Sequence, residues 1–312
     1  MNEFLTGIFV TPFLDIASGP VFFAEVVVSG LLAGVMYSMV ALGFVLIFKA
    51  SGVFNFAQGI MVLFAALTLV GLMERGVPLW LALLLTVAVM VMLAYAIERV
   101  MLRKLVNQDP FTLLMATIGL NFFLEGTGEM VWGSNVKRLD VGIPDDSIEV
   151  AGMLLNQFEL FAAVIAAVLV TLLAVLSQKT KIGRALRAVA DDHQAATAVG
   201  IPLKTIWVTV WAVSGIVALV AGIMWGAKSG VQFSLSLIAL KALPVLILGG
   251  LTSIPGAIVG GLIIGVGEKV GEVYWGPAIG GAIENWFAYV LAMVFLMFRP
   301  HGLFGEEIIE RV

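Results

Sequence analysis

The stretch Gln178–Thr205, with the sequence QKTKIGRALRAVADDHQAATAVGIPLKT, is a polar interruption in a chain that is otherwise mostly apolar. It carries five of the chain's seventeen Lys and Arg residues, and long apolar segments flank it on both sides. Charges at this density are costly in the hydrocarbon core, so we expect this stretch in water at a membrane surface. Its alanine-rich middle favours a helix, and Gly200 followed by Pro202 ends it. We predict a water-exposed helix over residues 183–200, held between two membrane spans.

The overall composition fixes the broad class of protein. Hydrophobic residues make up 61% of the 312 residues and charged residues only 12%, with a mean hydropathy of +1.08. A soluble domain has about 25% charged residues, so this composition indicates an integral membrane protein. The chain has no cysteine, which excludes disulfides and thiolate metal sites. Its two histidines, His193 and His301, lack a metal-binding spacing, so we expect no bound metal.

Nine apolar segments are candidates for membrane crossings, each of which needs about 20 apolar residues. Some are short and could be re-entrant, so eight or ten crossings are alternatives. We predict an all-α integral membrane protein, a polytopic helical bundle of about eight or nine transmembrane helices, with residues 1–312 in a single domain. The candidate spans are Val26–Phe48, Phe56–Met73, Leu79–Ile97, Thr112–Trp132, Leu160–Leu176, Ile206–Trp225, Leu237–Leu251, Pro255–Val270 and Ile283–Phe298.

The basic residues predict an orientation. With the N-terminus outside, eleven Lys and Arg residues lie on the inner side and five on the outer side, which agrees with the positive-inside rule. The stretch Gln178–Thr205 is then cytoplasmic, and residues 133–157 form the longest external loop. We expect a multi-pass protein of the cell inner (plasma) membrane with a cytoplasmic C-terminus.

The expected cytoplasmic helix has features of a docking element. Gly183 marks its expected start, and Arg187 and Asp191 are four residues apart, so they can pair on one face. Its small-residue surface and firm stop favour docking into a partner's groove. A solvated linker between two spans is the alternative.

A motif at the end of this helix carries a resemblance. Gln194-Ala195-Ala196-x-x-x-Gly200 resembles the Glu-Ala-Ala-x-x-x-Gly loop by which ABC importer permeases engage their ATPase subunits, with Gln in place of the usual Glu. The order and spacing of further stretches resemble the permeases of the branched-chain amino acid (Liv-type) transporters. These stretches are residues 30–43, 55–59, 116–119, 183–202, 248–257 and 299–305.

The resemblance implies an ABC importer permease with type II-like architecture. It implies as partners two ATP-binding cassette ATPase subunits, a second, related permease subunit and a periplasmic substrate-binding protein, with membrane lipid around them. It makes the segment 183–200 the coupling helix. The residues implied in ATPase coupling are Arg184, Arg187, Asp191, Asp192, Gln194, Ala195, Ala196 and Gly200.

The chain itself lacks the means to hydrolyse ATP. The sequence contains no Gly-x-x-x-x-Gly-Lys-Ser/Thr phosphate-binding loop, so ATP would bind to partner subunits and this chain would bind no cofactor. Its basic clusters flank the spans, and membrane orientation explains them better than nucleic-acid binding does.

Polar residues inside the expected spans are candidates for the substrate path, because burial in lipid penalises each one. Interhelical hydrogen bonding is the alternative explanation for them. Lys241 either extends its ammonium to the outer interface or meets a substrate carboxylate. Glu268, Lys269 and Glu272 are expected at a hydrated helix end. The path candidates are Asn55, Gln58, Thr117, Asn121 and Glu125.

Glycines are frequent in the spans, and several are four residues apart, as in Gly30/Gly34 and Gly261/Gly265. Such pairs let helices approach closely. Gly249, Gly250 and Gly256 flank a proline turn and are candidates for a gating hinge, with packing as the alternative.

These observations favour a transmembrane permease subunit of an ABC importer, which is not itself an enzyme, for branched-chain amino acids or related small amino acids and amides. An ion-coupled secondary transporter of small solutes is the main alternative, although we find no repeat between the two halves. A membrane enzyme or scaffold is disfavoured because no catalytic constellation is visible.

Overall fold

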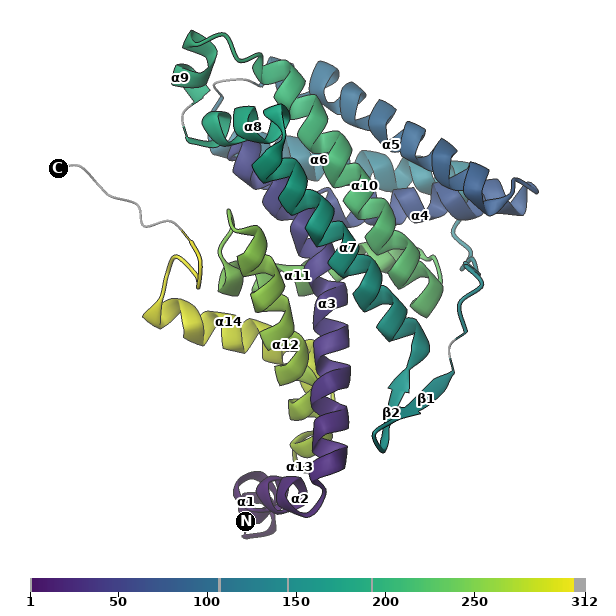
Figure 1. The fold of residues 1–312 in the computed structure, drawn as a ribbon, viewed down its shortest axis with the longest axis vertical. Coiled ribbons are helices and arrows are strands. Elements are labelled where there is room, and N and C mark those ends of the chain that lie inside the picture. The colour runs from purple at the N-terminus through teal and green to yellow at the C-terminus, as the bar shows by residue number, and fades with distance from the viewer. Residues whose placement is uncertain (1, 106–107, 145, 192, 306–312) are drawn as a thin grey trace, which may run out of the picture.

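A computed structural model describes residues 2–105, 108–144, 146–191 and 193–305 (Figure 1). Within this part, the long helices are α3 (Pro20–Ser51), α4 (Gln58–Glu74), α5 (Leu79–Val100), α6 (Pro110–Trp132), α7 (Gln157–Lys179), α10 (Leu203–Ser229) and α12 (Ile254–Tyr274). Shorter ones are α1 (Asn2–Phe9), α2 (Thr11–Ser18), α8 (Lys181–Asp191), α9 (His193–Ala198), α11 (Ile238–Gly249), α13 (Gly276–Ile279) and α14 (Phe287–Phe298). The 3₁₀ helices are η1 (Leu102–Lys104), η2 (Phe233–Leu237) and η3 (Ile283–Asn285).

The predicted helical membrane bundle is confirmed, with differences at the ends of its spans. Each of the nine predicted segments contains an α-helix. Among the described residues, five helical stretches are long and apolar enough to cross a membrane, and three further apolar helices are shorter. The first span is longer than predicted, because Pro20 begins α3 and Gly52, with φ +65°, ends it. The last is shorter, because residues 283–285 form a 3₁₀ helix and α14 begins at Phe287.

One hairpin departs from the all-helical pattern. Strands β1 (Ser147–Val150) and β2 (Met153–Asn156) pair antiparallel within the predicted external loop, with Ser147 opposite Asn156. The hairpin and α1–α2 lie at one end of the bundle, whereas α8 and α9 lie at the other (Figure 1). The polar stretch and the long loop therefore lie at opposite ends, as the predicted topology requires.

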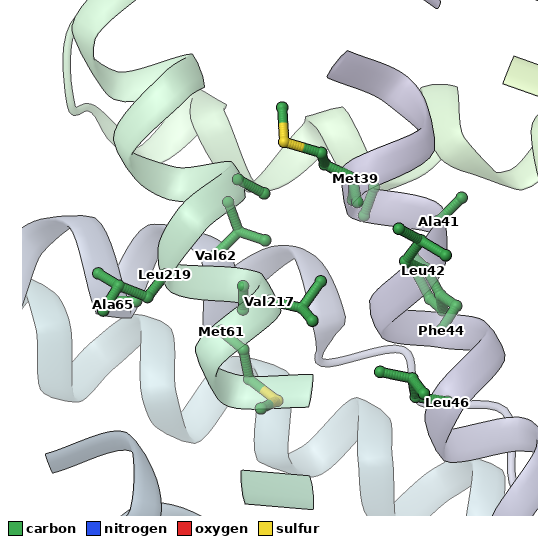
Figure 2. Close-up of a cluster of buried hydrophobic side chains, with 14 of the residues drawn as sticks. Met39, Ala41, Leu42, Phe44, Leu46, Met61, Val62, Ala65, Val217 and Leu219 are labelled. Atoms are coloured by element: carbon green, nitrogen blue, oxygen red, sulfur yellow. The ribbon is translucent and has the colours of Figure 1, made fainter. Parts of the chain in front are cut away.

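Helix α3 is the centre of the bundle and runs along its length (Figure 1). It packs against α7, α10, α11 and α12. A helix that is apolar on all sides is expected in such a position. Figure 2 shows part of the core, where Met39 of α3, Met61 of α4 and Val217 of α10 lie in one apolar cluster. Large apolar side chains that remain exposed on α5, α6 and α7, such as Phe122 and Leu172, are available to lipid or to another subunit.

The most extensive helix contact among the described elements joins α3 to α12, and it runs through glycines. A Cβ atom on Gly34 would lie 2.3 Å from the Gly261 carbonyl oxygen, and one on Gly265 would lie 2.3 Å from the Gly30 carbonyl oxygen. The Ser38 hydroxyl lies within hydrogen-bonding distance of the Gly34 and Ala257 carbonyl oxygens, at 2.9 and 3.1 Å. The prediction that these glycine pairs permit close helix approach is confirmed.

We expect Gly34→Ala to destabilise the protein, because its methyl group would force α3 and α12 apart. Overpacking of this kind costs about 1–3 kcal/mol, which exceeds the gain in helix propensity of about 1 kcal/mol. The thermal unfolding midpoint of detergent-purified protein should fall.

Gly119→Ala is the matched control, because a Cβ atom there has no neighbour within 4 Å and Gly119 also lies inside a helix. Its midpoint should stay the same or rise slightly. Equal midpoints for the two variants would contradict the importance of the α3–α12 contact.

Candidate functional site

The predicted docking segment forms two short helices, α8 and α9, and Asp192 between them lies outside the described residues. The predicted start at Gly183 is wrong by two residues. The Thr180 hydroxyl accepts the Gly183 N–H at 2.9 Å and caps α8, which begins at Lys181. Gly183 lies in the first turn, where a Cβ atom would lie 2.2 Å from the Ser177 carbonyl oxygen. The glycine permits the sharp corner between α7 and α8.

Helix α8 is held firmly at the end of α7. The Arg187 guanidinium donates a hydrogen bond to the Ser177 carbonyl oxygen at the end of α7. The side chains of Leu186 and Val189, on the inner face of α8, are buried. Helix α8 packs against α3, α7 and α10. The side chain of Asp191 lies outside the described part, so its pairing with Arg187 stays a prediction. Sequence reasoning missed Leu186 and Val189, although their three-residue spacing is that of a buried helix face.

Helix α9 ends as the sequence predicts. Gly200 has φ +87°, and the N–H groups of Gly200 and Ile201 donate to the carbonyls of Thr197 and Ala196, each at 3.0 Å. A glycine in the left-handed region with these bonds is a common helix stop. Ala196 is buried against the bundle, whereas Arg184 and Ala195 are exposed.

The exposed surface of α8 and α9 is not purely polar. Ile182 is 43% exposed, and Val199, just beyond α9, is 77% exposed. The side chain of Gln194 lies outside the described part. The described surface therefore offers a cation, Arg184, next to apolar groups at the end of the bundle.

Three predicted path residues meet in one buried group, which we call the polar knot: Asn55, Gln58 and Thr117, together with Ser214. Asn55 and Gln58 are connected by a hydrogen bond of 3.4 Å from the Asn55 amide nitrogen to Gln58 Oε1. The Thr117 hydroxyl donates to the Phe54 carbonyl at 3.2 Å and accepts the Phe56 N–H at 3.3 Å. The knot holds the turn between α3 and α4 against α6.

Ser214 of α10 is the member of the polar knot that sequence reasoning missed. Its hydroxyl lies 3.1 Å from Gln58 Oε1 and 3.0 Å from the Gly43 carbonyl oxygen, within hydrogen-bonding distance of both. Gln58 lies so close to Gly43 that a Cβ atom there would be 1.9 Å from Gln58 Nε2. The sequence signal that could have identified Ser214 was a polar serine inside an apolar span.

The other two path candidates lie apart from the knot. Asn121 and Glu125 lie one and two turns further along α6 than Thr117, and both are partly exposed. The predicted stripe on α6 is therefore buried at Thr117 and accessible beyond it. Whether any of these residues contacts a solute stays a prediction.

The three predicted hinge glycines lie in a tight backbone junction. A Cβ atom on Gly249 would lie 2.1 Å from the Gly256 carbonyl oxygen, and Gly250 has φ +102°. The N–H groups of Leu303 and Phe304 donate to the carbonyls of Leu248 and Gly249 at 2.8 and 3.1 Å. Any movement of this hinge would therefore also move the segment 302–305, a contact that the sequence did not reveal.

One electrostatic prediction is wrong. Glu268 was expected at a hydrated helix end, but its side chain is only 3% exposed. Glu272, one turn later, does cap the following segment and accepts the N–H groups of Ala282 and Ile283 at 3.0 and 2.6 Å. Among the described residues, no group of His, Cys, Asp and Glu could hold a metal ion.

Comparison with known proteins connects this arrangement to transport. The family model described as branched-chain amino acid transport system / permease component matches residues 26–299. The chain is similar to the high-affinity branched-chain amino acid transport system permease protein BraD of Pseudomonas aeruginosa, at 28% identity over 93% of this chain and 98% of BraD. It is equally similar to LivH of Escherichia coli, a permease protein of the same description, at 28% identity over 93% of this chain and 98% of LivH. The fructose import permease protein FruF of Bifidobacterium longum is 27% identical over 85% of this chain and 74% of FruF.

We expect Gln58→Leu to destabilise the protein, because the buried Asn55 amide would lose its oxygen acceptor and Ser214 would keep only the Gly43 carbonyl. A buried polar group without a partner costs about 1–3 kcal/mol. Thermal unfolding of detergent-purified protein would measure this loss.

Thr209→Val is the matched control, because the Thr209 hydroxyl is exposed and bonds only to the Thr205 carbonyl of its own helix. Its midpoint should match that of the unmodified protein. A Gln58→Leu midpoint equal to that of the control would show that the polar knot contributes nothing to stability.

Proposed function

Because this chain belongs to the family of branched-chain amino acid transport system permease components, we propose that it forms half of the translocation path of an importer for branched-chain or related small amino acids. Members of this family are multi-pass inner-membrane permeases of ABC transporters and are not themselves enzymes. They work with ATPase and substrate-binding partners. This assignment favours the ABC importer over the ion-coupled secondary transporter.

The proposed assembly contains two ATPase subunits, a second, related permease and a periplasmic binding protein. The binding protein docks at the end of the bundle that carries the β1–β2 hairpin and α1–α2. The ATPases dock at the opposite end, on α8 and α9, which makes that end cytoplasmic. ATP binds to the ATPase subunits, and this chain needs no cofactor.

The attachment of α8 is the observation that carries the coupling role. Gly183 packs on the end of α7, and Arg187 bonds the last turn of that helix. A displacement of α8 by an ATPase is therefore transmitted along α7 and, through Leu186 and Val189, to the core. The proposed contacts with the ATPase are Arg184, Asp191, Gln194 and Ala195, with Asp192 beside them.

The proposed path follows the accessible part of α6. Asn121 and Glu125 offer polar groups there, and the second permease would complete the path. The polar knot of Asn55, Gln58 and Thr117 fixes the α3–α4 turn next to it. Gly249, Gly250 and Gly256 are the proposed pivot of α11 against α12 during gating.

We expect Gly200→Val to uncouple ATP hydrolysis from uptake. A β-branched residue at φ +87° is strained by about 1–3 kcal/mol, which would disturb the end of α9 and its docking. Assembled complex in proteoliposomes should hydrolyse ATP with a lower ratio of solute transported to ATP consumed.

Gly76→Val is the matched control. Gly76 has φ +82° and, like Gly200, no neighbour within 4 Å of a Cβ atom, but it follows α4 and not α9. It should keep the normal coupling ratio. Unchanged coupling in Gly200→Val would argue against docking at α9.

We expect Asn121→Leu to lower the rate of uptake without loss of assembly, because it removes a polar group from the proposed path. Uptake by the assembled complex, normalised to the amount of complex, would measure this effect.

Thr127→Val is the control on the same helix, because the Thr127 hydroxyl bonds only to the Phe123 carbonyl one turn away. Normal uptake in the surviving Asn121→Leu complex, with a reduced yield of complex, would assign Asn121 to packing instead.

A further inference from the structure

A cavity with two basic residues in its wall lies at the end of the bundle that carries α8, and we call it the basic cavity. It measures about 340 Å³, and Lys49 of α3 and Arg187 of α8 both line it. Thr252 and Ser253, in the turn between α11 and α12, add hydroxyl groups. No Asp or Glu is among the described residues that line it. The described wall of the basic cavity is therefore positively charged.

The two cations can still bind an anion. Within the described part of the chain, the ion pairs that form do not involve Lys49 or Arg187. The Arg187 guanidinium donates to the Ser177 carbonyl oxygen, and a guanidinium has further N–H donors. Basic pockets between membrane helices near the membrane surface attract anionic lipid head groups.

A second cavity, which we call the apolar groove, continues from the basic cavity along the bundle. It measures about 330 Å³ and is lined by α3, α7 and α12. Helices α7 and α12 both pack against α3 and flank it in Figure 1. The two cavities share Val170 of α7 and Ile258 of α12. The groove is apolar apart from the hydroxyls of Ser38 and Thr171, and both of these bond to backbone carbonyls.

The two cavities follow the order of a lipid head group and its acyl chain. On α3, the basic cavity includes Lys49 and the apolar groove extends back to Val35. At about 1.5 Å per residue, this part of the helix is about 21 Å long. One leaflet of a bilayer contains about 15 Å of hydrocarbon. The groove is therefore long enough for the acyl chain of a lipid whose head group lies at Lys49.

We propose that one anionic phospholipid, from the leaflet at the α8 end, binds across the basic cavity and the apolar groove. Its phosphate accepts hydrogen bonds from the Lys49 ammonium and the Arg187 guanidinium. One acyl chain fills the apolar groove between α3, α7 and α12. The inference goes beyond the proposed function, because it requires only that the chain spans a membrane, as members of its family do.

Charge and shape together favour an anionic lipid over other occupants. A free phosphate ion would pair with the cations but leave the apolar groove empty. An apolar helix of another subunit would fill the groove but leave both cations unpaired. A zwitterionic lipid carries an ammonium group of its own, which weakens its attraction to basic residues. An anionic lipid satisfies both cavities at once.

Native mass spectrometry of the complete complex with its ATPases, purified in detergent, provides the test. The probes are dioleoyl-phosphatidylglycerol, which is anionic, dioleoyl-phosphatidylcholine, which is zwitterionic, and inorganic phosphate, which has no acyl chain. We expect saturable binding of phosphatidylglycerol and at least about fivefold weaker binding of phosphatidylcholine. Inorganic phosphate should displace phosphatidylglycerol no better than sodium chloride does at the same ionic strength.

Lys49→Met should weaken the binding of phosphatidylglycerol at least about fivefold, because it removes a cation from the basic cavity. Lys204→Met is the matched control. Lys204 is exposed at the start of α10, just after α9 in the chain, and does not line the basic cavity. Its removal should leave lipid binding unchanged.

Ala167→Phe tests the apolar groove. Ala167 is exposed in the wall of the groove, so a phenyl ring there would take the place of the acyl chain. Binding of phosphatidylglycerol should weaken at least about tenfold, because each buried methylene group contributes to lipid binding. Val168→Phe is the matched control, because Val168 is exposed on the same helix and does not line the groove.

The outcomes that would overturn the proposal are distinct. Equal binding of the two lipids, or unchanged phosphatidylglycerol binding in assembled Lys49→Met or Ala167→Phe, would exclude this site. No saturable lipid binding would mean that another subunit fills the groove. Specific displacement by inorganic phosphate would assign the basic cavity to a free anion. Co-elution with the ATPases shows that a variant is assembled, and if neither variant is, the comparison of probes on the unmodified complex decides.

Discussion

The contact between α3 and α12 is the constraint on which the other features depend. Lipid supplies no hydrophobic force between helices, so close packing and interhelical hydrogen bonds must hold them together. Gly34 and Gly265 allow the two backbones to touch, and the Ser38 hydroxyl bonds across the contact. Helix α12 then carries Glu268 to a fixed position beside α3. Its first turn, at Gly256, is fixed against the end of α11 in the same way.

Buried polar groups in this bundle fall into two kinds. In the polar knot, Gln58 Oε1 lies within hydrogen-bonding distance of Asn55 and Ser214 and so holds helices together, whereas Gln58 Nε2 is buried without a partner in the described part of the chain. Glu268 of α12 is also buried, and its Oε1 has no hydrogen-bond partner in the described part of the chain. Both kinds read alike in the sequence, as polar residues among apolar ones. Only the structure shows which of these polar atoms find a hydrogen-bond partner and which do not.

Sequence patterns predicted the features that depend on local chemistry. The apolar segments predicted where helices lie, because a crossing helix must be apolar over its length, and Gly200 predicted its helix stop. Features that depend on distant residues were missed. Ser214 lies 156 residues from Gln58, and the segment at Leu303 bonds to the end of α11. The sequence predicted that α8 begins at Gly183, but it begins at Lys181, because the Thr180 hydroxyl caps it. Both threonine and glycine occur at helix starts, so the sequence alone did not choose between them.

The firm attachment of α8 and the length of α3 connect the two ends of the molecule. Helix α8 is fixed to α7 by Arg187 and to the core by Val189, so it cannot be pushed without moving the helices beneath it. Helix α3 passes from that end to Tyr37 and then to the glycine contact with α12. Because α8 packs against α3, a displacement of α8 would reach the α3–α12 glycine contact through α3 itself.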